Sequence, residues 1–184
     1  MSRLAIERAS RVLGAGGVVA YPTEAVWGLG CEPENPHAFV RLLSLKRRPL
    51  HKGVILIAAD YSQLEPYLGQ ISSAALKPVL KSWPGPSTWL LPAAARTPAY
   101  LTGGRDTLAV RVTAHPLAAA LCRRYGGAIV STSANVSDRP AARSALHVRR
   151  YFDDRLDAIL NGDTGGMQRP TPIRELATGK LLRS

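Results

Sequence analysis

The segment TLAVRVTAHPLAAALCRRYGGAIVSTSAN, residues 107–135, decides the fold class. It opens with an apolar run over Thr107–Val112, which has the length and composition of a strand. A helix follows over His115–Tyr125, with Pro116 in its first turn, and a second strand begins at Ala128–Val130. Because strands alternate with helices here, we expect an α/β domain.

The alternation continues on both sides of this segment. Further helices are expected over 2–13, from Asn35 onward, over 72–82 and over Ser144–Phe152, and further strands over Val18–Tyr21, Val54–Ala59, 87–92, 157–160 and 181–183. Ser2 is the expected N-cap of the first helix. The irregular connections favour a mixed sheet over a plain doubly wound order. Since no repeat or linker is present, we expect a single domain over 1–184.

Composition limits the class of partner. Lys and Arg number 24 against 13 Asp and Glu, and the net charge of +11 argues for nucleic acid, nucleotide or an anionic membrane. No apolar run approaches the ~20 residues of a bilayer span, and the start lacks a secretory h-region. Cys31 and Cys122 form no CxxC, which gives a disulfide framework or a zinc site little support. We therefore expect a cytoplasmic protein without a membrane anchor.

The positive charge is unevenly distributed. Residues 41–52 hold five basic residues and no acid, and residues 66–137 hold seven basic residues against the single acid Asp106. A solvated basic face and a groove that receives phosphates both account for this pattern. No P-loop sequence is present, and GAGG at 14–17 precedes a strand, so the dinucleotide fingerprint also fails. A bound nucleotide would need another phosphate cradle.

Lys46-Arg47-Arg48-Pro49 is one candidate cradle. Pro49 disfavours the helical conformation at Arg48, so the preceding helix is expected to end near there. In an extended segment Lys46 and Arg48 would converge at an exposed groove, with Arg47 turned away. Two such cations suit a triphosphate, whereas a cluster that complements the helix dipole is the alternative.

Ser131-Thr132-Ser133-Ala134-Asn135 is a second candidate. In an extended chain Ser131, Ser133 and Asn135 share one face, at the carboxyl end of a strand where open α/β sheets bind ligands. Hydroxyl and amide groups can bond phosphate or carboxylate oxygens without adding charge. Turn and capping chemistry is the alternative.

Two further features, residues 21–30 and Arg111, each allow a ligand-binding and a structural interpretation. In residues 21–30, YPTEAVWGLG, the backbone could approach a ligand closely and Trp27 could form a flat wall; an ordinary turn with a core tryptophan is the alternative. Arg111 lies in an apolar strand, where an unpaired charge is costly. It could bind a substrate carboxylate bidentately, or lie on an exposed face or pair with Asp106.

Taken together, these segments resemble one family. YPTEAVWGLG, LKRRP followed by KGVILIA, WPGPSTWLLP, LAVRVTAHP, VSTSANVS and the C-terminal PTPIRELATGKLLR occur in the family's order. The chain resembles the YrdC-type threonylcarbamoyl-AMP synthases, in their short, single-domain bacterial form, from about residue 10 to 183. The most specific pieces are the K-x-R pair (Lys46, Arg48), the S-x-N pair (Ser133, Asn135) and PTE at 22–24.

The resemblance implies a fold, an activity and partners. The fold would be a twisted α/β sheet with flanking helices and an open basic cavity. The activity would be formation of threonylcarbamoyl-adenylate and pyrophosphate from L-threonine, bicarbonate or CO₂ and ATP, assisted by Mg²⁺. Downstream proteins would transfer the threonylcarbamoyl group to tRNA beside the anticodon, and tRNA or double-stranded RNA is a further possible partner. We expect a monomer, no catalytic nucleophile and no metal ligand from protein side chains.

The resemblance also implies roles for individual residues. Asp138 departs from the family, which usually has glycine after SANxS, and this puts the shape of that loop in doubt. The residues implied for ATP are Lys46, Arg48, Ser133, Asn135, Arg143 and Arg183; those implied for threonine are Thr23, Arg111, Ser131 and Thr171; and Thr107 falls at a ligand position without a firm role.

Two other classes of function remain. A non-catalytic RNA-binding or ribosome-maturation protein would explain the charge equally well, but only 6% of the residues are aromatic and no RNP-like stacking motif is present. The other is an ATP-binding regulatory subunit. Pyrophosphate release from ATP that depends on threonine distinguishes the enzyme from both.

Overall fold

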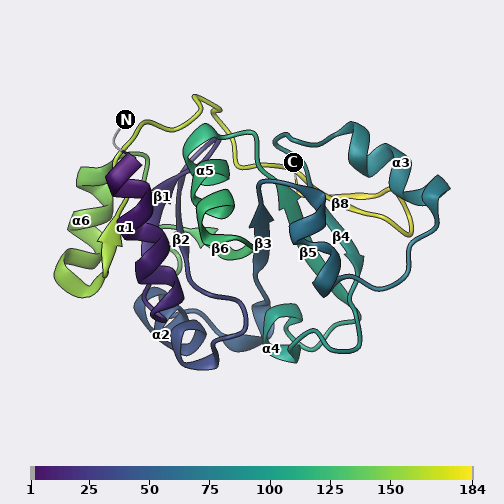
Figure 1. Cartoon of the computed structure of the whole chain (residues 1–184), viewed down its shortest axis with the longest axis horizontal. Helices are drawn as coiled ribbons and strands as arrows, with labels where there is room; N and C mark the ends of the chain where they lie inside the picture. The colour runs from purple at the N-terminus through teal and green to yellow at the C-terminus, as the bar shows by residue number, and fades with distance from the viewer. Residues whose placement is uncertain (1–2, 184) are drawn as a thin grey trace.

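The computed structural model describes residues 3–183, apart from the side chain of Arg183. The expected cap Ser2 lies outside the described residues. Within them the chain forms one mixed sheet in the order β7-β1-β2-β6-β3-β5-β4-β8-β9, with helices on both sides (Figure 1). The strands are β1 (Val19–Pro22), β2 (Trp27–Gly30), β3 (Ile55–Ala58), β4 (Thr88–Pro92), β5 (Thr107–Val112), β6 (Ile129–Ser133), β7 (Ala158–Ile159), β8 (Ile173–Glu175) and β9 (Leu181–Arg183).

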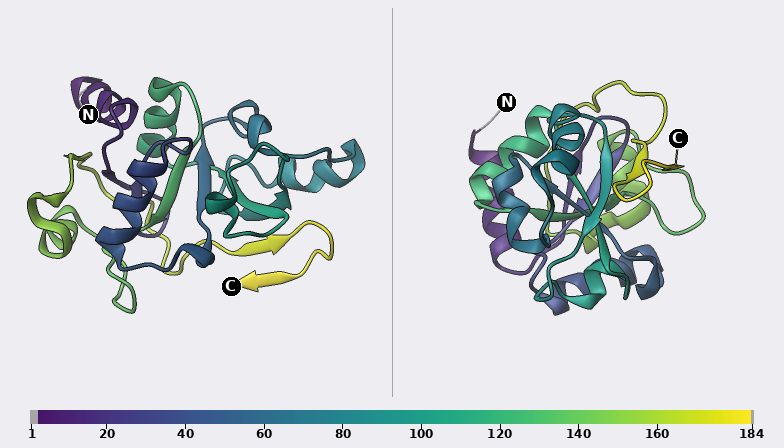
Figure 2. Two further views of the ribbon diagram at one scale, coloured as in Figure 1. Left: turned by 90° about the horizontal axis from the view of Figure 1, so that it is seen from below. Right: turned by 90° about the vertical axis from the view of Figure 1, so that its right-hand side faces the viewer.

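Six α-helices and four short 3₁₀ segments connect the strands of residues 3–183. The α-helices are α1 (Arg3–Gly14), α2 (Pro36–Lys46), α3 (Ser73–Lys81), α4 (Ala99–Thr102), α5 (Pro116–Tyr125) and α6 (Ala145–Phe152), and the 3₁₀ segments are η1 (Leu50–Lys52), η2 (Tyr61–Gln63), η3 (Glu65–Tyr67) and η4 (Asp153–Arg155). Figure 2 shows the β8–β9 hairpin, in yellow, at the end of the molecule away from α1 and α6. None of these helices combines the length and apolarity needed to cross a lipid bilayer.

The α/β class and the mixed sheet are confirmed. β3 lies between β5 and β6, and it pairs parallel with β5 and antiparallel with β6. The strands on either side of α5 are therefore not neighbours, although they are consecutive in the chain. Local periodicity predicts these strands and this helix correctly, but it carries no information on which strand separates them.

Two strands were not expected. β2 is WGLG, and its two glycines argue against a strand by propensity. The glycines are needed because the Tyr21 ring lies over them: a Cβ at Gly30 would lie 2.8 Å from Tyr21 Cε1 and 2.6 Å from the Val130 carbonyl oxygen. β8 was also missed; its three residues pair parallel with β4 over Thr88–Leu90.

Different helices pack on the two faces of the sheet. On one face Ile57 and Ile129 are fully buried in a cluster with Leu13 of α1 and Leu121 of α5. The opposite face packs in a larger core that includes Leu56 of β3 and side chains of α2 and α6. Beyond α5, the first face continues to Ile55 and Ser131, and the cavity described below lies over these positions.

Candidate functional site

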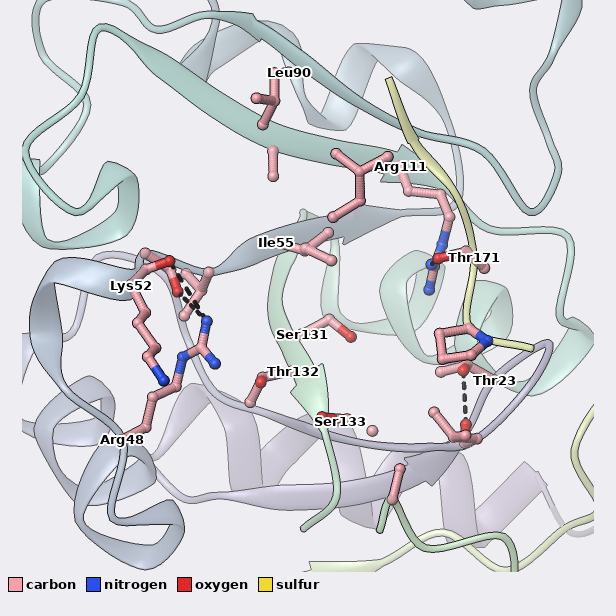
Figure 3. A pocket seen from close by; sticks show the side chains of 18 of the residues that line it. Thr23, Arg48, Lys52, Ile55, Leu90, Arg111, Ser131, Thr132, Ser133 and Thr171 are labelled. Carbon is pink, nitrogen blue, oxygen red and sulfur yellow. Dashed lines mark hydrogen bonds between the residues drawn. The ribbon is translucent and has the colours of Figure 1, made fainter. Parts of the chain in front are cut away.

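The cavity has a volume of about 490 Å³, within the usual range for small-molecule sites. Its floor is a row of cross-strand neighbours: Leu90 pairs with Ala109, Ala109 with Ile55, and Ile55 with Ser131. Paired residues share a face of the sheet. Figure 3 shows Arg48 and Lys52 at one end of the cavity, Thr23, Arg111 and Thr171 at the other, and Ser131, Thr132 and Ser133 between them.

Arg111 lies at the end with the threonine hydroxyls and is buried, with 5% of its surface exposed. Its Nη1 donates to Thr171 Oγ1 at 2.6 Å, and its Nη2 lies 3.4 Å from Glu24 Oε2. The expected alternative of a pair with Asp106 is wrong. The arginine instead pairs with a carboxylate from the β1–β2 turn. Its buried Nε has no hydrogen-bond partner among the described residues, so the guanidinium retains donors.

Glu24 is the residue of this end that sequence reasoning missed. Its Oε1 accepts from Thr113 Oγ1 at 2.7 Å and from the Ala114 amide at 3.1 Å. Burial alone would raise the pKa of Glu24, but the Arg111 guanidinium and these hydrogen bonds hold it below its ordinary value. The carboxylate is therefore charged and neutralises Arg111. PTE was quoted only as a motif, and no local signal links its glutamate to Arg111.

Three hydroxyl residues line the cavity at this end and next to it. Thr23 donates its hydroxyl to the Val26 carbonyl at 2.7 Å, which holds the turn between β1 and β2. The hydroxyl oxygens of Thr171 and Thr88 lie 3.4 Å apart. Ser131, in the middle of β6, is part of the cavity floor. The structure thus brings together Thr23, Arg111, Ser131 and Thr171 from four distant segments.

The opposite end of the cavity is cationic. Arg48 donates to the Gly53 carbonyl at 2.9 Å, so its guanidinium is braced along the wall. Lys52 and Arg105, which were not among the expected site residues, also line this end. Arg105 is braced by the carbonyls of Thr102 and His51. The described lining of the cavity includes no carboxylate, so this end attracts anions.

The expected extended path from Lys46 to Arg48 is wrong. α2 ends at Lys46, and Arg47 caps it in the left-handed conformation with φ 51°. This turn leaves Arg47 exposed, as expected, and aims Arg48 at the cavity. Lys46 is buried rather than in an exposed groove, and it does not line the cavity. Its ammonium donates to the carbonyl oxygens of Ser133 and Asn135.

The S-x-N pair forms a connected unit, but by a different path from the one expected. β6 ends at Ser133, and the chain turns so that the Asn135 amide donates to the Ser133 carbonyl at 3.0 Å. Ser133 Oγ then donates to Asn135 Oδ1 at 2.6 Å. Further along, Asp138 takes φ 66°, a conformation that favours glycine and that aspartate tolerates. Asp138 therefore replaces the family's glycine at a position where the backbone adopts the left-handed conformation.

The remaining expected residues lie in different places. Thr107, at the start of β5, lines the cavity. Arg143 is exposed, does not line it, and donates to the Gln168 carbonyl. The backbone of Arg183 lies in β9, and its side chain is outside the described structure. Trp27 is fully buried in the core, as the alternative of a core tryptophan predicts, and it also borders the cavity. No group of three or more His, Cys, Asp or Glu side chains in residues 3–183 could hold a metal ion.

Comparison with other sequences gives a consistent set of relatives. The Sua5/YciO/YrdC family model, described as "Telomere recombination", matches residues 11–184. A protein of Halorhodospira halophila named threonylcarbamoyl-AMP synthase is 58% identical over 178 residues, 97% of this chain and 93% of its own. A Pseudomonas aeruginosa protein of the same name is 52% identical over 95% of this chain and 94% of its own.

Solved structures agree with this assignment. Sua5 of P. abyssi, solved in complex with L-threonine, superposes with a TM-score of 0.93 at 33% identity and covers 100% of this chain. The present chain spans about half the length of that protein, 54%. YciO of E. coli superposes with a TM-score of 0.87 at 26% identity, over 100% of this chain and 90% of its own. The twisted mixed sheet, its open basic cavity and these matches lead to one conclusion: the chain belongs to the Sua5/YciO/YrdC family.

Proposed function

We propose that this protein is a threonylcarbamoyl-AMP synthase, a nucleotidyltransferase that forms threonylcarbamoyl-adenylate and pyrophosphate from L-threonine, bicarbonate or CO₂, and ATP. The observation that carries the proposal is the two-ended cavity, in a chain 58% identical to a protein of that name. One end offers hydroxyls and a neutralised arginine, and the other offers cations. These suit an amino acid and a triphosphate, respectively.

Threonine is assigned to the end that holds Thr23, Arg111, Ser131 and Thr171. Arg111 has donors beyond those it uses on Glu24 and Thr171, and a guanidinium can direct them at a substrate carboxylate. The neighbouring hydroxyls can bond the threonine hydroxyl. The likeness to a Sua5 structure that contains L-threonine supports this assignment.

ATP is assigned to the cationic end and the adjoining S-x-N turn. Arg48 would bond the phosphates, joined by Lys52 and Arg105, while Ser133 and Asn135 would hold the nucleotide from the β6 side. Thr107 lines the same cavity and is a further proposed ligand residue. Arg143 and Arg183, which the resemblance to the family implies, complete the set of residues proposed for ATP.

The chemistry requires charge neutralisation and alignment, and it requires no protein nucleophile. The nitrogen of the neutral threonine amine forms a bond to the carbon of CO₂ and loses a proton to solvent, which gives a carbamate anion. A carbamate oxygen then forms a bond to the α-phosphorus of ATP, and the bond from that phosphorus to the β-phosphate bridging oxygen breaks, so pyrophosphate leaves. Both reactants are anions, so fixed cations and hydroxyl donors stabilise the transition state. Mg²⁺ would enter with ATP on phosphate and water oxygens, since the described lining has no carboxylate.

The cellular setting is also part of the proposal. The product would be passed to proteins that attach threonylcarbamoyl to tRNA adenosine beside the anticodon, in the cytoplasm. The activity would reside in a single domain over 1–184 that acts as a monomer. The net charge of +11 would allow contact with tRNA or double-stranded RNA.

The test is pyrophosphate release from ATP, with threonine and bicarbonate each supplied and omitted. We expect release only when both are present, together with a threonylcarbamoyl-adenylate product identified by mass spectrometry. Release without threonine, or no release under any condition, would contradict the proposal. The RNA-binding and regulatory-subunit alternatives both predict the latter result.

A further inference from the structure

Lys46 differs from the other cations near the site because protein oxygens enclose its ammonium group. Nζ donates to the Ser133 carbonyl, to the Asn135 carbonyl at 2.8 Å and to Asn135 Oδ1 at 3.2 Å. An ammonium has three N–H donors, and each has an acceptor here. With 2% of its surface exposed, Lys46 is cut off from the cavity that Arg48 lines. Burial and the neighbouring Arg48 charge lower the pKa of Lys46 to about 7.

The backbone of the same residue holds the other end of the turn. The Ser137 amide donates to the Lys46 carbonyl at 2.8 Å, so one residue of α2 binds residues 133, 135 and 137. Within that turn Asn135 Oδ1 accepts from both Lys46 and Ser133. Asn135 Nδ2 also donates to the carbonyls of Val136 and Arg139, so Lys46 and the turn itself together fix the orientation of the asparagine side chain.

We infer that Lys46 is a positioning residue, which orders the Ser133–Ser137 turn so that Ser133 and Asn135 meet the nucleotide, and that it does not itself contact phosphate. The inference rests on the proposed nucleotide site. To reach a phosphate, the ammonium would have to leave three oxygens, and buried acceptors left without donors are costly. The K-x-R and S-x-N pairs thus act together. Lys46 and Asn135 order the turn, and Arg48 supplies the positive charge that lines the cavity.

Chemical labelling of the wild-type protein tests where the ammonium lies. The protein is treated with an amine-reactive reagent at mildly alkaline pH, with and without ATP, and labelled lysines are identified by mass spectrometry. We expect Lys46 to stay unlabelled in both conditions. Lys52, which is exposed at the cavity, should be labelled without ATP and protected by it. Labelling of Lys46 without ATP, with protection when ATP is added, would overturn the inference. If ATP does not protect Lys52 from labelling, the proposed nucleotide site is contradicted. The labelling of Lys46 without ATP tests the position of its ammonium group whatever the result at Lys52.

Variants test how Lys46 acts on ATP. Arginine is a strong phosphate ligand, so Lys46→Arg should preserve ATP binding if the lysine is a direct ligand. We expect both Lys46→Arg and Lys46→Met to raise the ATP Kd by ~10-fold or more. In an Asn135→Ala background, Lys46→Met should add less than ~2-fold, because both changes disable one unit. Arg47→Ala, which removes the exposed charge next to Lys46 at the end of α2, is the matched control.

The split between substrates separates positioning from general loosening of the fold. Because the hydrogen bonds of the Lys46 side chain to the described residues all go to the S-x-N turn, its variants should change the KM for ATP and leave the KM for threonine within ~2-fold. ATP binding by Lys46→Arg equal to wild type would overturn the inference, as would Lys46→Met and Asn135→Ala effects that simply multiply.

Discussion

The buried Glu24–Arg111 pair allows a sharp test of how the threonine end is built. Glu24→Gln keeps the size of the side chain and its Oε1 acceptor, but removes the charge that faces Arg111 at 3.4 Å. Both residues are buried, so the arginine is left with an uncompensated buried charge. Breaking such a pair by removing one partner costs roughly 3–5 kcal/mol. We expect a loss of stability of about that size at neutral pH, measured by urea unfolding.

The pH dependence of the loss gives a second check. The pKa of Glu24 is lower in the folded protein than its ordinary value of 4.5. Its contribution is therefore fully present above pH 4.5 and is lost as the pH falls through the folded-state pKa. The stability difference between wild type and Glu24→Gln should shrink over that acid range. Glu7→Gln, in a partly exposed pair with Arg124, is the control and should change stability little.

A compensating variant completes the test. Replacing both members, as in Glu24→Gln with Arg111→Met, removes the unpaired charge and should recover part of the lost stability. The reasoning is refuted if Glu24→Gln costs under ~1 kcal/mol at neutral pH, since that is the range of exposed pairs. A cost that stays constant down to the acid transition would refute it equally.

Four further outcomes concern the substrates. Arg48→Ala should weaken ATP use by ~10-fold to 100-fold in a protein of wild-type stability, measured as kcat/KM, because one charge-assisted contact is lost. Ser133→Ala and Asn135→Ala should be less than additive in a double-mutant cycle, since Ser133 Oγ bonds Asn135 Oδ1 at 2.6 Å; strict additivity would mean that they act separately. In bicarbonate-dependent pyrophosphate release, serine should be a poor substrate and valine nearly inert, because losing a hydroxyl that the site bonds costs more than the ~1–3 kcal/mol of a methyl group. Arg111→Lys should raise the KM for threonine, since lysine lacks the planar fork that bonds Glu24, Thr171 and a carboxylate together; an unchanged KM would make Arg111 purely structural.

The sequence by itself determined the α/β class and most of its elements. Strand and helix periodicity is local, and β5, α5 and β6 lie where residues 107–135 predict them. The grouping of the site came from the resemblance to the family: Thr23, Arg48, Arg111, Ser131 and Thr171, which are among the residues it implies for threonine and ATP, line one cavity. Periodicity and composition alone do not group residues from such distant segments.

Only the tertiary structure decided which of these side chains touch. Glu24 meets Thr113 across 89 positions of the chain, and Lys46 meets Asn135 across another 89. Both contacts depend on the order of strands in the sheet, which local patterns do not encode. The Lys46–Pro49 segment, read as extended, and the resemblance of its K-x-R pair to the family predicted that Lys46 is an exposed phosphate ligand, whereas the contact of the end of α2 with the turn after β6 buries it. Strand propensity likewise did not predict the glycine-rich strand β2. Its glycines are required by a tertiary contact, the Tyr21 ring packed over Gly30.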